Sequence, residues 1–207
     1  MTTVVDYGAG NLRSVCNTLE ALGAPYEVTN QPESVREAKQ IILPGVGHFG
    51  QMIRALDDLQ LRGPLMERIQ DGAPFLGICV GLQCLFEGSE ESPGSRGLGV
   101  FPGTIRRFKG DARVPHMGWN SLKVLRPSRL LNGLEEQPFT YFAHSYYAPV
   151  VPETAVTCTY IQPYSAIVER GNVFAVQFHP EKSGTVGQNV VRNFLELSCL
   201  PRELSPA

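Results

Sequence analysis

Apolar, β-branched runs alternate with segments of helical hydrophobic spacing in the first half of the chain. Residues 2–7, which are rich in β-branched side chains, predict a first strand, and residues 11–22 predict a helix. Within that helix, apolar side chains recur every three or four residues, at Leu12, Val15, Leu19 and Leu22. Gly23 follows at once, and glycine commonly ends a helix.

The same alternation continues to residue 78. We expect strands at residues 25–28, 40–43 and 75–78, and helices at residues 33–39 and 52–69. Strands separated by helices in this way are typical of a parallel sheet with crossover helices. The first half therefore predicts an α/β fold.

The second half has a different pattern. Residues 103–108 and 139–143 look like strands joined by short turns, which is more typical of antiparallel pairing. Residues 173–178 predict a strand that leads into His179, and residues 185–197 predict a closing helix. We therefore expect one domain over residues 1–207, with an open, mostly parallel central sheet, flanking helices and an added antiparallel strand region.

Composition narrows the class of protein. The 207 residues are 43% hydrophobic and 18% charged, which is typical of a folded globular chain. A net charge of −2 gives no electrostatic basis for binding nucleic acid or a membrane surface. No apolar stretch approaches bilayer length, and the first residues lack the pattern of a secretion signal. We expect a cytoplasmic protein.

The cysteines favour a reducing compartment. Their odd number and wide spacing argue against a disulfide framework, and the absence of Cys-x-x-Cys or clustered Cys and His argues against a metal site. The five are Cys16, Cys79, Cys84, Cys158 and Cys199. Only Cys79 has special surroundings.

Cys79 stands between Gly77 and Gly81, after the apolar run 73–76 and before residues 82–86, which look like the start of a helix. A strand-to-helix turn strains a nucleophile's backbone, and flanking glycines let neighbouring chain pass closely. The helix would direct free N–H groups at the sulfur and favour the thiolate. The pattern predicts a cysteine nucleophile for acyl transfer or hydrolysis, although alone it fits a buried cysteine in a tight turn equally well.

A thiolate nucleophile needs a base and a group that orients the base. Of the four histidines, His179 has Glu181 two residues later, and an extended path would place the two on the same side. The motif by itself also fits a strand end capped by a turn. Combined with the cysteine turn one hundred residues upstream, the catalytic interpretation becomes the better one.

Attack on an acyl carbon also needs donors for the developing oxyanion. The Val80 N–H directly follows the nucleophile, and the glycine-containing loop 44–47 follows a strand expected beside the cysteine strand. The loop also fits a plain strand-to-helix turn or a phosphate site. It lacks the Lys-Ser/Thr of a P-loop and the longer glycine pattern of a dinucleotide site.

Three segments together, residues 75–83, 44–47 and 177–181, resemble class I glutamine amidotransferases. Segments 6–12, 115–120, 141–147 and 179–183 resemble one branch of that class, the glutaminase subunits of imidazole glycerol phosphate synthases. The resemblance implies that Cys79, His179 and Glu181 are a triad that hydrolyses glutamine to glutamate and ammonia through a γ-glutamyl thioester. It implies no cofactor.

The resemblance also assigns further residues. Val80 and the Val46–Gly47 part of the loop would form the oxyanion hole, and the loop is expected to be poorly oriented until a partner binds. Glutamine would be held by Gln83, Glu91, Ser145 and Tyr146. The alternatives for Gln83 and Glu91 are an ordinary polar helix residue and a solvated loop charge. His116 and His144 are expected to be structural or interfacial.

Ammonia released into bulk water would be protonated and lost, so the family passes it to a synthase partner. Here the implied partner is a (β/α)8 cyclase subunit, which forms imidazole glycerol phosphate and an aminoimidazole carboxamide ribotide. The positions that match its interface are Asn11, Met117, Trp119, Tyr141 and Lys182. Trp119 could instead be a core aromatic, but large aromatics often anchor interfaces.

Three other functions remain open from the residues. The chain could be the glutaminase of another amidotransferase, such as those of anthranilate or guanylate synthesis. It could be a free-standing cysteine peptidase or γ-glutamyl hydrolase on the same scaffold, which would be fully active alone. It could also be a binding module in which Cys79 is merely structural.

Overall fold

A computed structural model describes residues 1–8 and 11–197, so Cys199 lies outside the described residues. Its centre is an eight-stranded sheet, in which the first five strands below run parallel and the last three antiparallel. From one edge to the other the strands are β2 (Tyr26–Thr29), β1 (Thr2–Val5), β3 (Ile41–Gly45), β4 (Phe75–Cys79), β13 (Val173–Val176), β12 (Gln162–Arg170), β11 (Thr154–Tyr160) and β8 (Lys123–Val124). The predicted α/β fold with a mostly parallel central sheet is confirmed.

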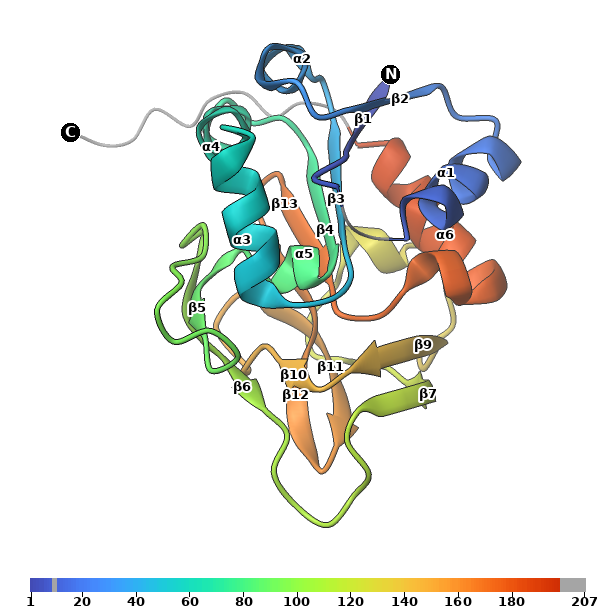
Figure 1. Ribbon diagram of the computed structural model, residues 1–207. Helices are drawn as coiled ribbons and strands as arrows, with labels where there is room; N and C mark the ends of the chain where they lie inside the picture. Colours follow the sequence, from blue (N-terminus) through green and yellow to red (C-terminus); the bar gives the residue numbers. More distant parts are fainter. Residues whose placement is uncertain (9–10, 198–207) are drawn as a thin grey trace, which may run out of the picture.

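Helices cover both faces of the parallel strands. Helices α1 (Leu12–Ala21) and α6 (Gly184–Leu195) pack together on one face, while α2 (Pro32–Glu37), α3 (Phe49–Asp58) and α4 (Arg62–Gln70) lie on the other (Figure 1). Since both faces are covered, every residue of β3 and β4 is buried. This double cover is why these strands read as continuous apolar runs in the sequence.

The single helix expected at residues 52–69 is wrong. Helix α3 ends at Asp58, Gln60 adopts a left-handed conformation with a φ of 56°, and a new helix begins at Arg62. Pro64 lies in the first turn of α4, where its missing N–H has no helical partner to lose. In the middle of one long helix the same proline would break a hydrogen bond, so the chain forms two helices.

The helix expected after Cys79 is also wrong in length. Helix α5 (Val80–Gln83) is a single turn, and Phe86 begins strand β5 (Phe86–Ser89). This strand pairs in parallel with β6 (Phe101–Arg107), which pairs antiparallel with β10 (Tyr146–Tyr147), so the expected antiparallel style holds only in part. Short apolar runs fit a strand or a helix equally well, and here pairing with β6 decides.

A separate ribbon of β7 (His116–Ser121) and β9 (Phe139–His144) lies beside the main sheet (Figure 1). Two 3₁₀ turns complete the fold, η1 (Arg129–Leu131) and η2 (Pro180–Lys182). The Tyr141 carbonyl accepts from the His179 N–H at 2.9 Å, and the Tyr141 N–H donates to Ser183 Oγ at 2.9 Å. The ribbon is thereby tied to the segment that follows β13.

Candidate active site

Cys79 ends strand β4 in a strained backbone conformation. Its φ of 54° and ψ of −105° lie in a region that L-residues rarely adopt. The expected strain at this turn is therefore present. Helix α5 has only four residues, so the longer helix dipole expected to favour the thiolate is absent.

Glycines allow this turn to pack against the neighbouring strand. A Cβ on Gly81 would lie 2.1 Å from the Leu43 carbonyl oxygen, and one on Gly45 would lie 2.5 Å from the Gly81 nitrogen. Neither contact is possible for a larger residue, since both clashing atoms are backbone. The glycines thus bring the loop after β3 directly against the Cys79 turn.

His179 and Glu181 form a hydrogen-bonded pair beside Cys79. His179 Nδ1 lies 2.9 Å from Glu181 Oε1, and both side chains are buried. The extended path that their spacing led us to expect is wrong, because residues 180–182 form a 3₁₀ turn. That turn folds the carboxylate back onto the imidazole.

The charge state of His179 follows from its neighbours. Burial alone lowers the pKa of His179, but the Cys79 charge, hydrogen bonds to Cys79 and Glu181, and the Glu181 charge raise it to about 10. At neutral pH the imidazole is therefore protonated beside the sulfur. Since Nδ1 is engaged by Glu181, Nε2 is the nitrogen left to face Cys79.

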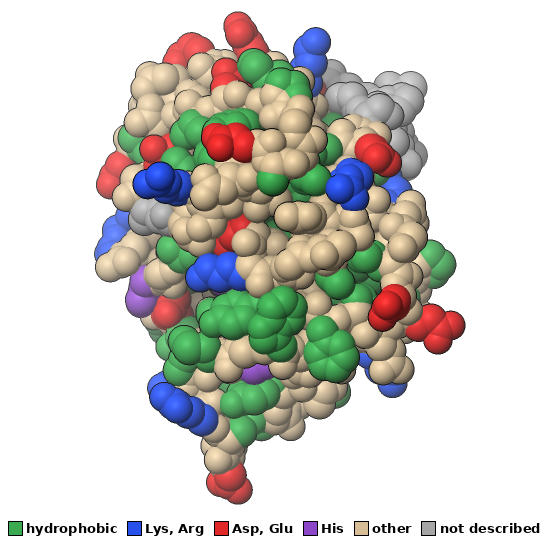
Figure 2. Space-filling model, turned by 90° about the vertical axis from the view of Figure 1, so that its right-hand side faces the viewer, with side chains coloured by type: hydrophobic (Ala, Val, Ile, Leu, Met, Phe, Trp, Pro, Cys, Tyr) green, Lys and Arg blue, Asp and Glu red, His purple; other side chains and the backbone are tan. Residues whose placement is uncertain are grey.

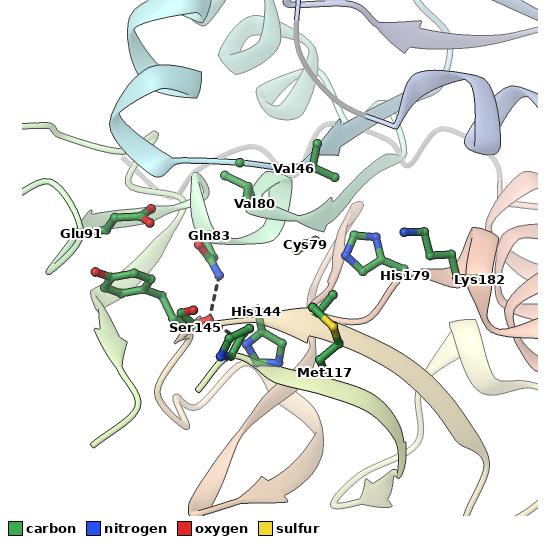
Figure 3. A pocket seen from close by; sticks show the side chains of 14 residues that line it. Val46, Cys79, Val80, Gln83, Glu91, Met117, His144, Ser145, His179 and Lys182 are labelled. Atoms are coloured by element: carbon green, nitrogen blue, oxygen red, sulfur yellow. Dashed lines mark hydrogen bonds between the residues drawn. The ribbon is translucent and has the colours of Figure 1, made fainter. Parts of the chain in front are cut away.

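A cavity of about 380 Å³ opens over these groups. In Figure 3, Cys79 lies between Gln83 on one side and His179 on the other, with Val46 and Val80 along the opposite wall from His144 and Met117. The sequence-predicted residues that line the cavity are Val46, Gly47, Cys79, Val80, Gln83, Glu91, Met117, Ser145, Tyr146, His179 and Lys182. A volume of this size suits a small-molecule ligand.

In the predicted oxyanion loop, the backbone N–H of Val46 already donates a hydrogen bond within the protein. The Val46 N–H donates to the Tyr7 hydroxyl at 3.3 Å, and that hydroxyl lies 3.5 Å from the Val46 carbonyl oxygen. Tyr7 is buried, and burial raises its pKa, so the hydroxyl stays neutral. Sequence reasoning did not single out Tyr7, although it stands inside the motif 6–12.

Two of the four predicted glutamine-holding residues are hydrogen-bonded to other parts of the protein. Gln83 is buried, and its Nε2 donates to the Tyr146 carbonyl at 2.9 Å and to Gln177 Oε1 at 3.2 Å. Glu91 is half-buried, and its Oε2 accepts from the Phe49 N–H at 2.7 Å, at the start of α3. Gln83 is therefore more than a surface helix residue, and Glu91 is more than a solvated loop charge.

Four of the five predicted interface residues lie together on the ribbon and η2. Met117 and Trp119 are 66% and 57% exposed, so Trp119 is not a core aromatic. The Trp119 and Tyr141 ring centres are 6.2 Å apart, and Lys182 Nζ lies 5.9 Å from the Tyr141 ring centre. Figure 2, which views the side of the molecule that carries β7 and β9, shows hydrophobic side chains gathered there.

Asn11 has a contact that its spacing did not predict. Its Nδ2 donates to Glu181 Oε1 at 3.4 Å, across 170 residues of chain. The segment after β1 thus touches the site twice, through Tyr7 at the loop and Asn11 at the carboxylate. Only the tertiary fold brings these groups together.

His116 and His144 are buried, as expected for structural histidines. Burial lowers the pKa of His116 to about 4. Burial also lowers the pKa of His144 to about 3, although its hydrogen bond to the Tyr146 carbonyl opposes this. The Nδ1 of His144 lies 2.8 Å from that carbonyl, so Nδ1 carries the proton.

Within residues 1–8 and 11–197, no group of three or more His, Cys, Asp or Glu side chains is arranged to hold a metal ion. Nor does any helix in these ranges have the length and apolar character needed to cross a membrane.

Residues 3–197 match the family described as Glutamine amidotransferase class-I. The chain therefore belongs to the class I glutamine amidotransferases. It is 46% identical over 198 residues to the imidazole glycerol phosphate synthase subunit HisH of Methanothermobacter thermautotrophicus, which covers 95% of this chain and 98% of that protein. It is 45% identical over 208 residues to the subunit of the same name from Deinococcus radiodurans, with 99% and 94% covered.

Solved structures share the fold. One is described as a crystal structure of glutamine amidotransferase, with a TM-score of 0.74 and 22% identity over 94% of this chain and 97% of that one. Another is the structure of PurLQS from Thermotoga maritima, with a TM-score of 0.74 and 20% identity over 94% and 96% of the two chains.

Proposed function

We propose that this chain is a glutaminase that hydrolyses glutamine to glutamate and ammonia, with Cys79, His179 and Glu181 as its triad. The observation that carries the proposal is the buried His179–Glu181 pair, 2.9 Å apart, beside a strained cysteine in a cavity of about 380 Å³. Family membership and the HisH relatives support the same function.

The chemistry follows from the charge state of the site. The Cys79 thiolate attacks the carboxamide carbon of glutamine, and the C=O electron pair moves to the oxygen. The Val80 N–H and the Val46–Gly47 segment stabilise that oxyanion. As the C–N bond breaks, the His179 imidazolium donates its Nε2 proton to the nitrogen, which leaves as ammonia.

The neutral imidazole then takes a proton from water, whose oxygen attacks the γ-glutamyl thioester. The C–S bond breaks and glutamate leaves, so the thiolate and imidazolium are restored. Glu181 holds His179 in the orientation that both steps need. Gln83, Glu91, Ser145 and Tyr146 line the same cavity and are proposed to hold the amino acid.

The ammonia is proposed to pass to a (β/α)8 cyclase subunit in the cytoplasm, which makes imidazole glycerol phosphate and an aminoimidazole carboxamide ribotide. The names of the HisH relatives as synthase subunits support this partner. So does the exposed apolar surface at Met117 and Trp119, next to the cavity. Large exposed aromatics of this kind often anchor an interface.

The test is glutamine hydrolysis with and without the cyclase subunit. We expect low activity alone and a strong increase when the cyclase and its nucleotide ligand are added. Cys79→Ser should abolish ammonia release, whereas Cys84→Ala, at a buried thiol whose pKa is raised by burial, should retain it. Full activity without the cyclase would favour the free-standing hydrolase, and failure to bind it would exclude the assignment to an imidazole glycerol phosphate synthase.

A further inference from the structure

Gln177 lies at the carboxyl end of β13, next to Cys79 at the end of β4. The two strands pair in parallel with Val176 opposite Ile78, so the next residue of each chain segment falls side by side. The Gln177 side chain is 0% exposed. Its Nε2 lies 3.7 Å from Cys79 Sγ, within hydrogen-bond reach of sulfur and across 98 residues of chain.

The orientation of this amide is determined by a chain of hydrogen bonds. The Tyr146 carbonyl can only accept, so Gln83 presents its NH₂ group to it, at 2.9 Å. The same NH₂ group donates to Gln177 Oε1 at 3.2 Å. The carbonyl end of Gln177 is therefore occupied by a donor, and its NH₂ end must face the sulfur. If the Gln177 amide were reversed, its NH₂ group would face the NH₂ group of Gln83, and its carbonyl oxygen would face the thiolate.

From this polarity we infer that Gln177 is a further catalytic residue, which donates an N–H to the Cys79 sulfur. This inference rests on the proposed glutaminase function. A donor to the sulfur favours the charged form and limits the directions in which the side chain can turn. The positive charge of His179 beside Cys79 favours the charged form of the sulfur as well.

The burial of Gln177 supports a role in the site rather than in the core. A fully buried amide costs free energy unless both of its ends are hydrogen-bonded, and an apolar side chain would fill the space without that cost. The two side-chain partners that the described part of the chain gives Gln177 are Gln83 and Cys79. Both line the cavity. The chain Tyr146–Gln83–Gln177–Cys79 thus connects a proposed glutamine-holding segment to the nucleophile.

The test is Gln177→Met, which keeps the volume and removes the donor. We expect alkylation of Cys79 by iodoacetamide, followed by peptide mass spectrometry on the acid side of its pH profile where the thiolate is only partly formed, to slow by about tenfold, because losing a hydrogen bond to a charged group leaves less thiolate. In the complex with the cyclase, kcat should fall with little change in KM. Gln177→Glu should slow alkylation further, because a carboxylate would then face the thiolate.

Gln40→Met is the matched control. Gln40 is also a buried glutamine whose side chain makes two hydrogen bonds, to Thr2 and the Phe194 carbonyl, at the opposite end of the strands. It should lose comparable stability and alkylate Cys79 at the wild-type rate. A wild-type alkylation rate in folded Gln177→Met would overturn the inference.

If Gln177→Met does not fold, Gln83→Met decides, since it releases the carbonyl end of Gln177 and frees the amide to reverse. Slower alkylation supports the inference, and an unchanged rate contradicts it. The alkylation rate measures the reactivity of the Cys79 sulfur in the absence of glutamine. A failed triad is recognised separately, by ammonia release that survives Cys79→Ser.

Discussion

The Tyr7 hydroxyl binds the Val46 N–H at 3.3 Å and thereby ties the end of β1 to the loop that follows β3. Val46 is one of the residues proposed to stabilise the oxyanion. In the structure described here its N–H is directed at a tyrosine, so this donor must be released before it serves the reaction.

Tyr7→Phe should therefore raise the glutaminase activity of the isolated chain. Losing a hydrogen bond worth about 0.5–1.5 kcal/mol makes the loop easier to turn, which corresponds to about a two- to tenfold increase. The measurement is ammonia release without the cyclase. A decrease, with the free energy of unfolding unchanged, would mean that Tyr7 holds the active conformation instead.

Glu181→Gln tests the orienting carboxylate. The amide keeps an oxygen near His179 Nδ1 but removes the charge that helps to raise the pKa of His179, so kcat should fall by about 100-fold. Glu169→Gln is the control, because Glu169 is also buried and pairs with Arg129 at 2.9 Å, away from the cavity. Equal losses of activity in the two variants would argue against a catalytic role for Glu181.

Acid should destabilise the protein through His116 and His144. Their folded-state pKa values are about 4 and about 3, below the ordinary 6.5. Between pH 6.5 and the folded-state pKa of each histidine, that histidine binds a proton in the unfolded chain but not in the folded one. The contribution of these neutral histidines to the free energy of unfolding is fully present above pH 6.5. Below pH 6.5 the free energy of unfolding falls by about 1.4 kcal/mol per pH unit for each histidine. Urea unfolding of His144→Asn, which keeps a donor for the Tyr146 carbonyl, should show a shallower fall. An unchanged slope would contradict this origin.

Gly81→Ala should disrupt the Cys79 turn. The added Cβ would lie 2.1 Å from the Leu43 carbonyl oxygen, so β3 and the turn must separate, at a cost of about 3 kcal/mol or more in the free energy of unfolding. Gly63→Ala is the control, since Gly63 is exposed in α4 with room for a Cβ, and alanine should stabilise it by up to about 1 kcal/mol. Urea denaturation measures both, and a neutral Gly81→Ala would show that the turn can shift without cost.

Trp119→Ala should weaken binding to the cyclase subunit by about 2 kcal/mol, or about 30-fold, with little effect on the stability of the free chain. The indole is 57% exposed, so it contributes little to the core. Val28→Ala, at a 42% exposed residue on the edge strand β2, is the control for lost surface area. Calorimetric titration with the cyclase gives both dissociation constants, and equal values would place the interface elsewhere.

Much of the site was readable from local sequence. Gly77 and Gly81 around Cys79 indicated a tight, strained turn, and the spacing of His179 and Glu181 indicated a pair, because each pattern involves neighbours within a few residues. Alternating apolar runs gave the parallel strands for the same reason. The helix break at Gln60 was missed although Pro64 marks it locally, whereas the short length of α5 depends on the pairing of β5 with β6, which the local sequence does not show.

The sequence by itself thus determined the nucleophile's turn, the His179–Glu181 pair and the order of strands and helices. Only the tertiary structure decided what touches them: Tyr7 at Val46, Asn11 at Glu181 and Gln177 at Cys79, across 39, 170 and 98 residues of chain. Local spacing carries no information about such pairs. Their distances are set by strand register and by how closely the glycine-containing segments pack, and both arise only when the whole sheet has formed.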